Sequence, residues 1–292
     1  MQIGLHIAGM RWPGLFILIA SLLAPAEALL TPQIVGRQRL LQGGRVPALL
    51  SSKTEVVTPS VIESGETAPP RLAYATLWVG LLVYAFGFAP GGSEAAGALD
   101  AELIKLMIQT PYDATNTISP VFGAIFNALG ILPAIYASLL LPGGKLSQKL
   151  PALPFVVSSF ALGFFGVGPY LGLRNKRTEV SDSERGRGSA LFEFKLTSLA
   201  MLGFALFLTY FAVTGQYAGS DRVADFIQAF QTQRLVHVST IDFTILSLAV
   251  QDPMREDMQR RNWSGPDAWA FAAVPVIGPC LYLLTRPSLP KE

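Results

Sequence analysis

Cysteine and histidine are nearly missing from this chain, and their scarcity removes several kinds of chemistry. Of 292 residues, Cys280 is the single cysteine, so neither an internal disulfide nor an intramolecular dithiol redox pair can form. His6 lies in an N-terminal segment typical of a leader, which leaves His237 as the sole histidine of the remaining chain. Histidine-rich zinc sites, clustered-histidine iron sites and paired-histidine haem ligation need more ligands. We therefore expect no metal centre.

Charge is also scarce. Asp, Glu, Lys and Arg make up 14% of the chain and apolar residues 51%, whereas soluble domains carry about 25% charged residues. The motifs G-x-S-x-G, H-E-x-x-H and the P-loop do not occur. Gly163, Gly166 and Gly168 follow the order G-x-x-G-x-G inside an apolar run, which favours helix packing over a dinucleotide loop. The sequence thus leans away from an enzyme, and we expect no nucleic-acid partner.

The chain is rich in long apolar runs. Four of them reach roughly 18 residues or more, which at 1.5 Å of rise per residue crosses a hydrocarbon core of about 30 Å. They cover residues 72–89, 118–141, 151–173 and 196–213. Two shorter runs, 235–250 and 268–284, would span with snorkelling flanks or local thinning of the bilayer. The pattern predicts an all-α membrane protein, a polytopic bundle of five to six transmembrane helices over residues 71–292.

The N-terminal seventy residues read as a leader. Residues 1–28 have a basic start, an apolar stretch and a small-residue cleavage pattern, as in a signal peptide. Residues 29–70 are rich in arginine and hydroxyl side chains and have no acid before Glu55, as in a transit peptide. The combination resembles the two-part leader of plastid proteins in algae with extra plastid membranes. The alternative is an ordinary signal peptide followed by a disordered linker, which would indicate a membrane of the secretory pathway.

Three polar residues inside the apolar runs are candidate site residues: Asp242, Asn127 and His237. A charged Asp at a helix centre costs about 2.5–3.5 kcal/mol on insertion scales, so Asp242 should face the bundle or find a donor. It is either a proton or ligand site, or an interhelical hydrogen bond that fixes the helix register. A third alternative is that the short run 235–250 does not fully cross the membrane. Asn127 leaves the first two alternatives open. His237 is a candidate pigment ligand or an interfacial hydrogen-bonding group.

Prolines inside the runs predict local breaks in hydrogen bonding. Pro133, Pro169, Pro275 and Pro279 should kink or end their helices, and neighbouring groups must then satisfy the carbonyls that they free. No pair of segments shows clear internal similarity, so the sequence does not support an inverted-repeat transporter.

The polar segments between the apolar runs have patterns of their own. Residues 220–233 and 93–109 have the helical spacing of amphipathic helices lying on a bilayer, the first capped by Ser220. Between the last two runs, Arg255, Glu256, Arg260 and Arg261 form a charged stretch that is either a solvated helix end or a partner-docking patch. With six spans, the Arg174 side carries most cations and would face the stroma or cytoplasm. Lys145, Lys149, Arg222, Arg234 and the N-terminus would lie opposite.

Several stretches are similar to multi-spanning proteins of unknown function from cyanobacteria and plastids. The similarity is carried by "TPYDATNTISPVFGAIFNALGILPAIYASLLLPGG", "QKLPALPFVVSSFALGFFGVGPYLGLR" and "STIDFTILSLAVQDPMREDMQRRNW" with "VIGPCLYLLTRPSL". The last region also resembles, more weakly, the plastid membrane family that includes neoxanthin-forming proteins. The first resemblance implies a location and a fold; it lends no catalytic residues.

These observations predict a multi-pass protein of a plastid membrane, thylakoid or inner envelope. The leading hypothesis is a non-enzymatic assembly or stability factor for a pigment–protein complex, with the bilayer and a photosynthetic membrane complex as partners and a pigment or lipid as an open cofactor question. A small transporter that uses Asp242 as its coupling group is one alternative. An enzyme acting on carotenoid or lipid, with Asp242, Asn127 and His237 polarising a substrate oxygen, is another.

Overall fold

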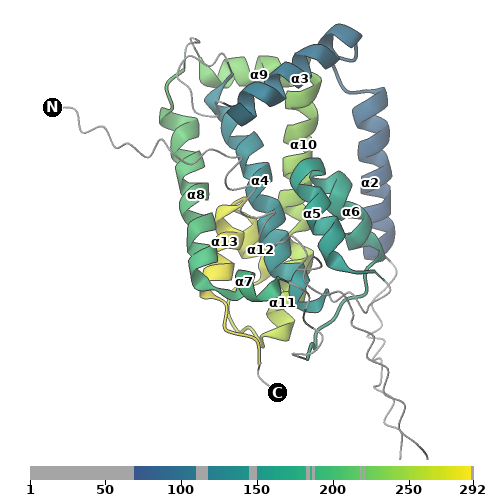
Figure 1. Ribbon diagram of the computed structural model, residues 1–292, viewed down its shortest axis with the longest axis vertical. Helices are drawn as coiled ribbons and strands as arrows, with labels where there is room; N and C mark the ends of the chain where they lie inside the picture. The colour runs from purple at the N-terminus through teal and green to yellow at the C-terminus, as the bar shows by residue number, and fades with distance from the viewer. Residues whose placement is uncertain are drawn as a thin grey trace, which may run out of the picture.

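The computed structural model describes residues 69–109, 118–144, 150–181, 185, 188–217, 219 and 221–290. Over these residues the secondary structure is entirely helical (Figure 1), which confirms the all-α prediction. The expected signal peptide and all but the last two residues of the expected transit-like segment lie outside the described residues.

Four long helices run the length of the bundle: α2 (Pro69–Gly87), α4 (Pro120–Leu140), α8 (Lys195–Thr214) and α10 (Arg234–Ala249) (Figure 1). They match the expected runs 72–89, 118–141, 196–213 and 235–250. Helix α4 is the central one: it packs against α5, α8 and α10, and the side chains of Leu132, Ile135 and Tyr136 are fully buried. Its N-terminus is set by Ser119, whose Oγ accepts a hydrogen bond from Val121 N, and by Pro120 in the first turn.

Two helical segments in the described chain are long and apolar enough to cross a membrane. One is Pro120–Gly143, in which the 3-10 turn η2 (Leu141–Gly143) extends α4; the other is α8. They differ in surroundings, because the apolar window of the first is 78% buried within the protein and that of the second only 22%. Helix α8 therefore lies at the periphery and presents most of its apolar surface outward.

The expected third span, 151–173, is wrong as a single helix. It consists of two short helices, α5 (Ala152–Leu162) and α6 (Phe164–Leu173), which pack against each other. Gly163 between them has φ 57° and ψ −130°, a conformation that ends a right-handed helix and that glycine adopts without a steric penalty. The segment is a helical hairpin, hairpin 1, rather than one long helix.

The expected last run, 268–284, is broken in the same way. Helix α12 (Ala268–Ala272) and helix α13 (Ile277–Thr285) pack together around a turn that contains Pro275 and Val276. Val276 has φ 62°, which is uncommon for a β-branched residue. This segment is hairpin 2.

The two halves of the bundle repeat one architecture. In the first half a long helix, α2, is followed by the surface helix α3 (Glu94–Gln109), the long helix α4 and hairpin 1; in the second, α8 is followed by α9 (Arg222–Thr232), α10 and hairpin 2. The contacts repeat as well, since α2 packs on α6 as α8 packs on α13, and α3 touches α10 as α9 touches α4. The sequence reading missed this duplication. Its trace is the motif Gly-Pro-x-Leu, which occurs at residues 168–171 in hairpin 1 and 278–281 in hairpin 2.

Helices α3 and α9 lie at one end of the bundle and α7 (Ser189–Glu193) and α11 (Gln251–Arg260) at the other (Figure 1). Both expected amphipathic helices are therefore present. Ser220 lies outside the described residues, and the cap of α9 is Asp221, whose Oδ1 accepts from Val223 N and Ala224 N.

The expected distribution of the loops between the two ends is partly wrong. Arg71, at the start of α2, donates a hydrogen bond to Asn175 next to Arg174. The carbonyl of Gly144, after α4, accepts from Ala152 N at the start of hairpin 1. The beginning of the bundle and the end of α4 thus lie at the Arg174 end, because hairpin 1 returns to the end from which it entered.

Candidate functional site

Asp242 lies partway along α10 and caps the tip of hairpin 1. Its side chain is buried, with 5% exposure for the residue, and Oδ1 accepts a hydrogen bond from Phe164 N at 2.8 Å. Phe164 is the first residue of α6, and its own preceding residue, Gly163, has no side chain to serve as a cap. A carboxylate at a helix N-terminus satisfies a free N–H and is favoured by the helix dipole. The acid thus ties α10 to the point where hairpin 1 turns.

Gly163 is required at this tip for a second reason. A Cβ built on Gly163 would lie 1.8 Å from Asp242 Oδ2 and 2.7 Å from its Cγ. Any larger residue would therefore displace the carboxylate, in addition to straining the backbone at φ 57°. Gly163 and Asp242 form one structural unit.

Asn127 and His237 lie elsewhere and have partners of their own. Asn127 donates from Nδ2 to the carbonyl of Gly123 in its own helix at 2.6 Å. His237 Nε2 lies 2.7 Å from the Tyr84 hydroxyl and Nδ1 lies 2.7 Å from the Phe230 carbonyl, while its ring stacks on Phe230 with centroids 4.1 Å apart. No contact found among the described residues joins Asp242, Asn127 and His237 to one another.

Two carbonyls freed by proline are satisfied by aromatic side chains on α2. Pro169 lacks the N–H that would bond the Phe165 carbonyl, and Trp78 Nε1 donates to that carbonyl at 3.0 Å. Pro253 likewise frees the Ala249 carbonyl, which accepts from the Tyr74 hydroxyl at 3.4 Å. The expectation that neighbours would satisfy such carbonyls is confirmed at Pro169. The expected helix end is found at Pro275, in the turn of hairpin 2. Helix α4 continues through Pro133, α6 continues through Pro169, and Pro279 lies in the first turn of α13.

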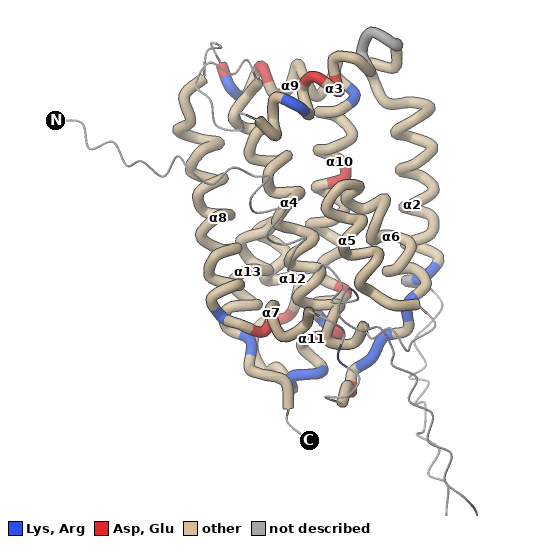
Figure 2. Tube along the Cα trace, in the orientation of Figure 1, with Lys and Arg blue, Asp and Glu red and all other residues tan. Residues whose placement is uncertain are grey.

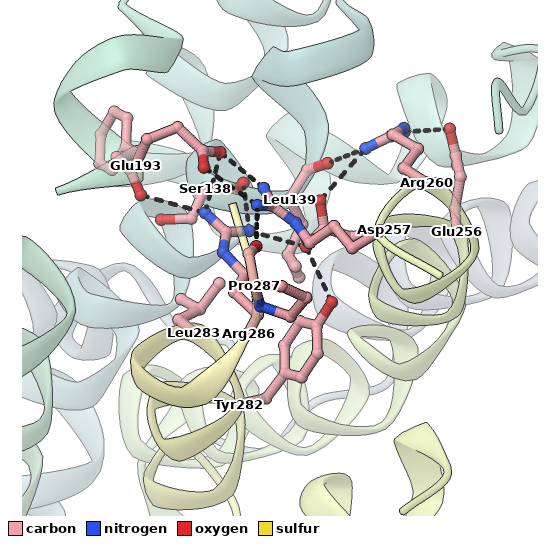
Figure 3. Close-up of polar contacts among 12 residues, drawn as sticks. Ser138, Leu139, Glu193, Glu256, Asp257, Arg260, Tyr282, Leu283, Arg286 and Pro287 are labelled. Carbon is pink, nitrogen blue, oxygen red and sulfur yellow. Dashed lines mark hydrogen bonds and ion pairs between the residues drawn. The ribbon is translucent and has the colours of Figure 1, made fainter. Parts of the chain in front are cut away.

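A buried ion-pair network lies at the α11 end (Figure 3). Asp257, which is fully buried, accepts from Arg261 Nε and from Arg286 Nη1, each at 2.8 Å, and from the Tyr282 hydroxyl at 2.9 Å. Arg261 also pairs with Glu193 of α7 at 2.6 Å. Burial alone would raise the pKa of Asp257, but the cations of Arg286, Arg261 and Arg260 outweigh it and hold the pKa below its usual value.

The other side of α11 holds hairpin 1 in the same manner. Arg174, at the end of α6, pairs with Glu256 and, at 3.1 Å, with Asp252. Arg260 also pairs with Glu256 and donates to the Leu139 carbonyl at the end of α4 at 2.9 Å. Each hairpin therefore ends in a buried arginine that is bound by acids of α11. Removing one partner of such a pair typically costs about 3–5 kcal/mol, because the other charge stays buried.

This network corrects the expectation for the charged stretch. Glu256, Arg260 and Arg261 are 3–5% exposed and bind within the chain, so they form neither a solvated helix end nor an outer patch. Arg255 does face outward, with 44% of its side chain exposed beside Asp267. A local sequence pattern could not reveal this burial, since the partners Arg174, Glu193 and Arg286 come from distant segments.

No group of three or more potential metal-ligating side chains occurs in the described part of the chain. Comparison with protein-family models, with curated proteins and with solved structures finds no match to this chain.

Proposed function

We propose that the chain is a multi-pass membrane protein with four crossing helices, α2, α4, α8 and α10, and two hairpins that enter from the α11 end. Figure 2 supports this arrangement: charged residues gather at the two ends, and between them a red segment marks α10, whose sole acid is Asp242. Large apolar side chains cover the outer sides of α2 and α8, among them Val83, Leu199 and Val213, each more than half exposed. Such a surface suits lipid better than water.

We place the protein in a plastid membrane, in the family of cyanobacterial and plastid multi-spanning proteins that it resembles. The leader-like composition of residues 1–70 supports this location. The cations at the α11 end, among them Arg71, Lys176 and Arg255, favour the stromal side for that end by the positive-inside rule.

Within that membrane, we propose a non-enzymatic role in the assembly or stability of a pigment–protein complex. One observation carries this proposal: the three polar side chains that stand out in the apolar runs, Asp242, Asn127 and His237, all bind the chain itself. Asp242 caps α6, Asn127 bonds Gly123, and His237 is held by Tyr84 and Phe230. Side chains committed in this way serve the fold, which leaves the outer surface as the working part of the molecule.

The test is extraction of the native membrane in mild detergent, followed by native gel separation and mass spectrometry. We expect comigration with photosystem or antenna subunits, both for the natural chain and for Asp242→Asn, because asparagine retains an oxygen that accepts from Phe164 N. Migration of the natural chain without such subunits would overturn the assembly role.

A proton-coupled transporter is the second candidate, and hairpin 1 favours it. Discontinuous helices with termini near the membrane midplane are where transporters place coupling ions, and Asp242 lies at such a terminus. In proteoliposomes, Asp242→Asn would then abolish proton-driven flux while thermal unfolding stayed unchanged. Equal flux in both chains would eliminate this candidate.

A further inference from the structure

The outer side of hairpin 2 carries an exposed surface that the proposed function does not yet use. Leu248, Trp269 and Val274 are exposed to 54%, 50% and 50%. Arg255 and Asp267 lie beside them as an ion pair at 3.2 Å, with 44% and 60% of their side chains exposed. These five residues are called the hairpin-2 face.

Three members of this face contact one another. Leu248 lies in the last turn of α10, and Arg255 lies in α11, which begins at Gln251 directly after that turn. The Arg255 guanidinium lies over the Trp269 ring, 5.8 Å from its centroid. Asp267 caps α12 by accepting from Trp269 N at 3.0 Å and also binds Arg255. The base of hairpin 2 is thereby fixed to α11.

The tip of hairpin 2 is exposed and has no side-chain cap, although the N–H groups of Ile277 and Gly278 bond within the turn. Helix α13 has nine residues, about 13 Å, so the turn at Ala273–Val276 lies near half the depth of a bilayer of about 30 Å. Ala273, Val274 and Pro275 are exposed there, and no side chain caps the N-terminus of α13. Irregular backbone at such a depth occurs where protein covers it or where it lines a water-filled cavity. Hairpin 1 has that cover in Asp242.

We propose that the hairpin-2 face binds a second copy of this chain in a two-fold symmetric dimer, an inference that rests on the proposed membrane architecture. A two-fold interface must be complementary to itself, and this face carries one cation and one anion side by side. Arg255 of one protomer faces the partner's Asp267, and its own Asp267 faces the partner's Arg255. Trp269 and Arg255 belong to the residue types that dominate binding energy at interfaces.

Reciprocal charge exchange tests the dimer directly. The full chain is purified in mild detergent and its mass is measured by native mass spectrometry and by cross-linking in bilayers. We expect Arg255→Glu alone and Asp267→Arg alone to weaken dimerisation at least about tenfold, because each homodimer then brings like charges together. Mixing the two variants should restore the dimer as a heterodimer. An exclusively monomeric natural chain, or a mixture without heterodimers, would refute the proposal.

The mixture also controls for local damage to the fold. Asp267→Arg loses the cap of α12 both alone and in the mixture. A dimer that forms only in the mixture therefore reports restored charge pairing. A second pair of variants tests the apolar part. Trp269→Ala should lower the dimer fraction at least about fivefold, whereas Tyr210→Ala, at an aromatic residue 66% exposed on α8, should leave it unchanged. Equal dimer fractions in these two variants would place the interface elsewhere. This experiment measures self-association, whereas the test of the proposed function measures comigration with a photosynthetic complex. Either proposal can therefore be confirmed while the other is refuted.

Discussion

Hairpin 1 and hairpin 2 have the same place in the two halves of the bundle but achieve their turns by different means. At the tip of hairpin 1 a glycine turns the chain and a carboxylate from α10 caps the second helix. At the tip of hairpin 2 a valine holds φ 62°, without a side-chain cap. Their bases, in contrast, are alike, because Arg174 and Arg286 both end in buried pairs with α11. Stability is therefore expected to depend on the bases of both hairpins, and on the tip chiefly in hairpin 1.

Breaking the bases should have the largest effect. Arg286→Met leaves Asp257 with one cation fewer, and Arg174→Met does the same to Glu256; each should lower the free energy of unfolding by about 3–5 kcal/mol. Thermal unfolding in detergent, followed by circular dichroism, measures both. A control is Arg255→Met, whose exposed pair should cost about 0–1 kcal/mol. Similar losses for all three variants would contradict the distinction between buried and exposed pairs.

Acidification probes the base of hairpin 2 without mutation. The pKa of Asp257 is lowered in the folded protein, so its contribution to stability is fully present above its unfolded pKa, about 3.9. That contribution is lost as the pH falls below about 4 toward the folded pKa, because the unfolded state then binds the proton more readily. We expect the unfolding temperature to fall over this range and to fall less in Asp257→Asn. Parallel pH profiles of the two proteins would count against the assignment.

The tip of hairpin 1 should be the next most sensitive position. Gly163→Ala must move the Asp242 carboxylate and strain the backbone, and we expect a loss of about 2–4 kcal/mol from strain and the broken cap. Gly203→Ala on α8 is the matched control, since nothing lies within 4 Å of its Cβ and helix propensity predicts a gain of up to about 1 kcal/mol. The prediction fails if both alanines are tolerated equally.

The tip of hairpin 2 should respond least. Val276→Gly relieves the positive φ but removes a buried side chain, and the two effects, each about 1–3 kcal/mol, oppose each other. We expect a net change within about 1 kcal/mol. Val236→Gly, at a buried helical position of α10, has no strain to relieve and should cost about 2–4 kcal/mol. Equal losses in the two variants would show that Val276 is unstrained.

The sequence allowed the four long helices to be predicted from their apolar runs, and it located Asp242 as an inward-facing acid. It did not show that the partner of Asp242 is a backbone N–H. That bond depends on Gly163, which breaks the run 151–173 with its positive φ. Hydropathy cannot predict the backbone conformation of a single residue. The burial of Glu256 and Arg260 was missed for a related reason: charged stretches are usually solvated, and only the folded chain brings Arg174 to them. The duplication was not predicted, because the helix contacts repeat between the two halves whereas the sequences share little more than the motif Gly-Pro-x-Leu.

The bond between Asp242 and Phe164 has a consequence for synthesis of the chain. Hairpin 1 is translated well before α10, so the first half of the bundle carries an uncapped helix terminus at the tip of hairpin 1 until Asp242 arrives. The first half is then unfinished by itself, and a ribosome that stops before α10 would leave the N–H of Phe164 without its cap. Order of synthesis thus makes the second half of the bundle the part that completes the first.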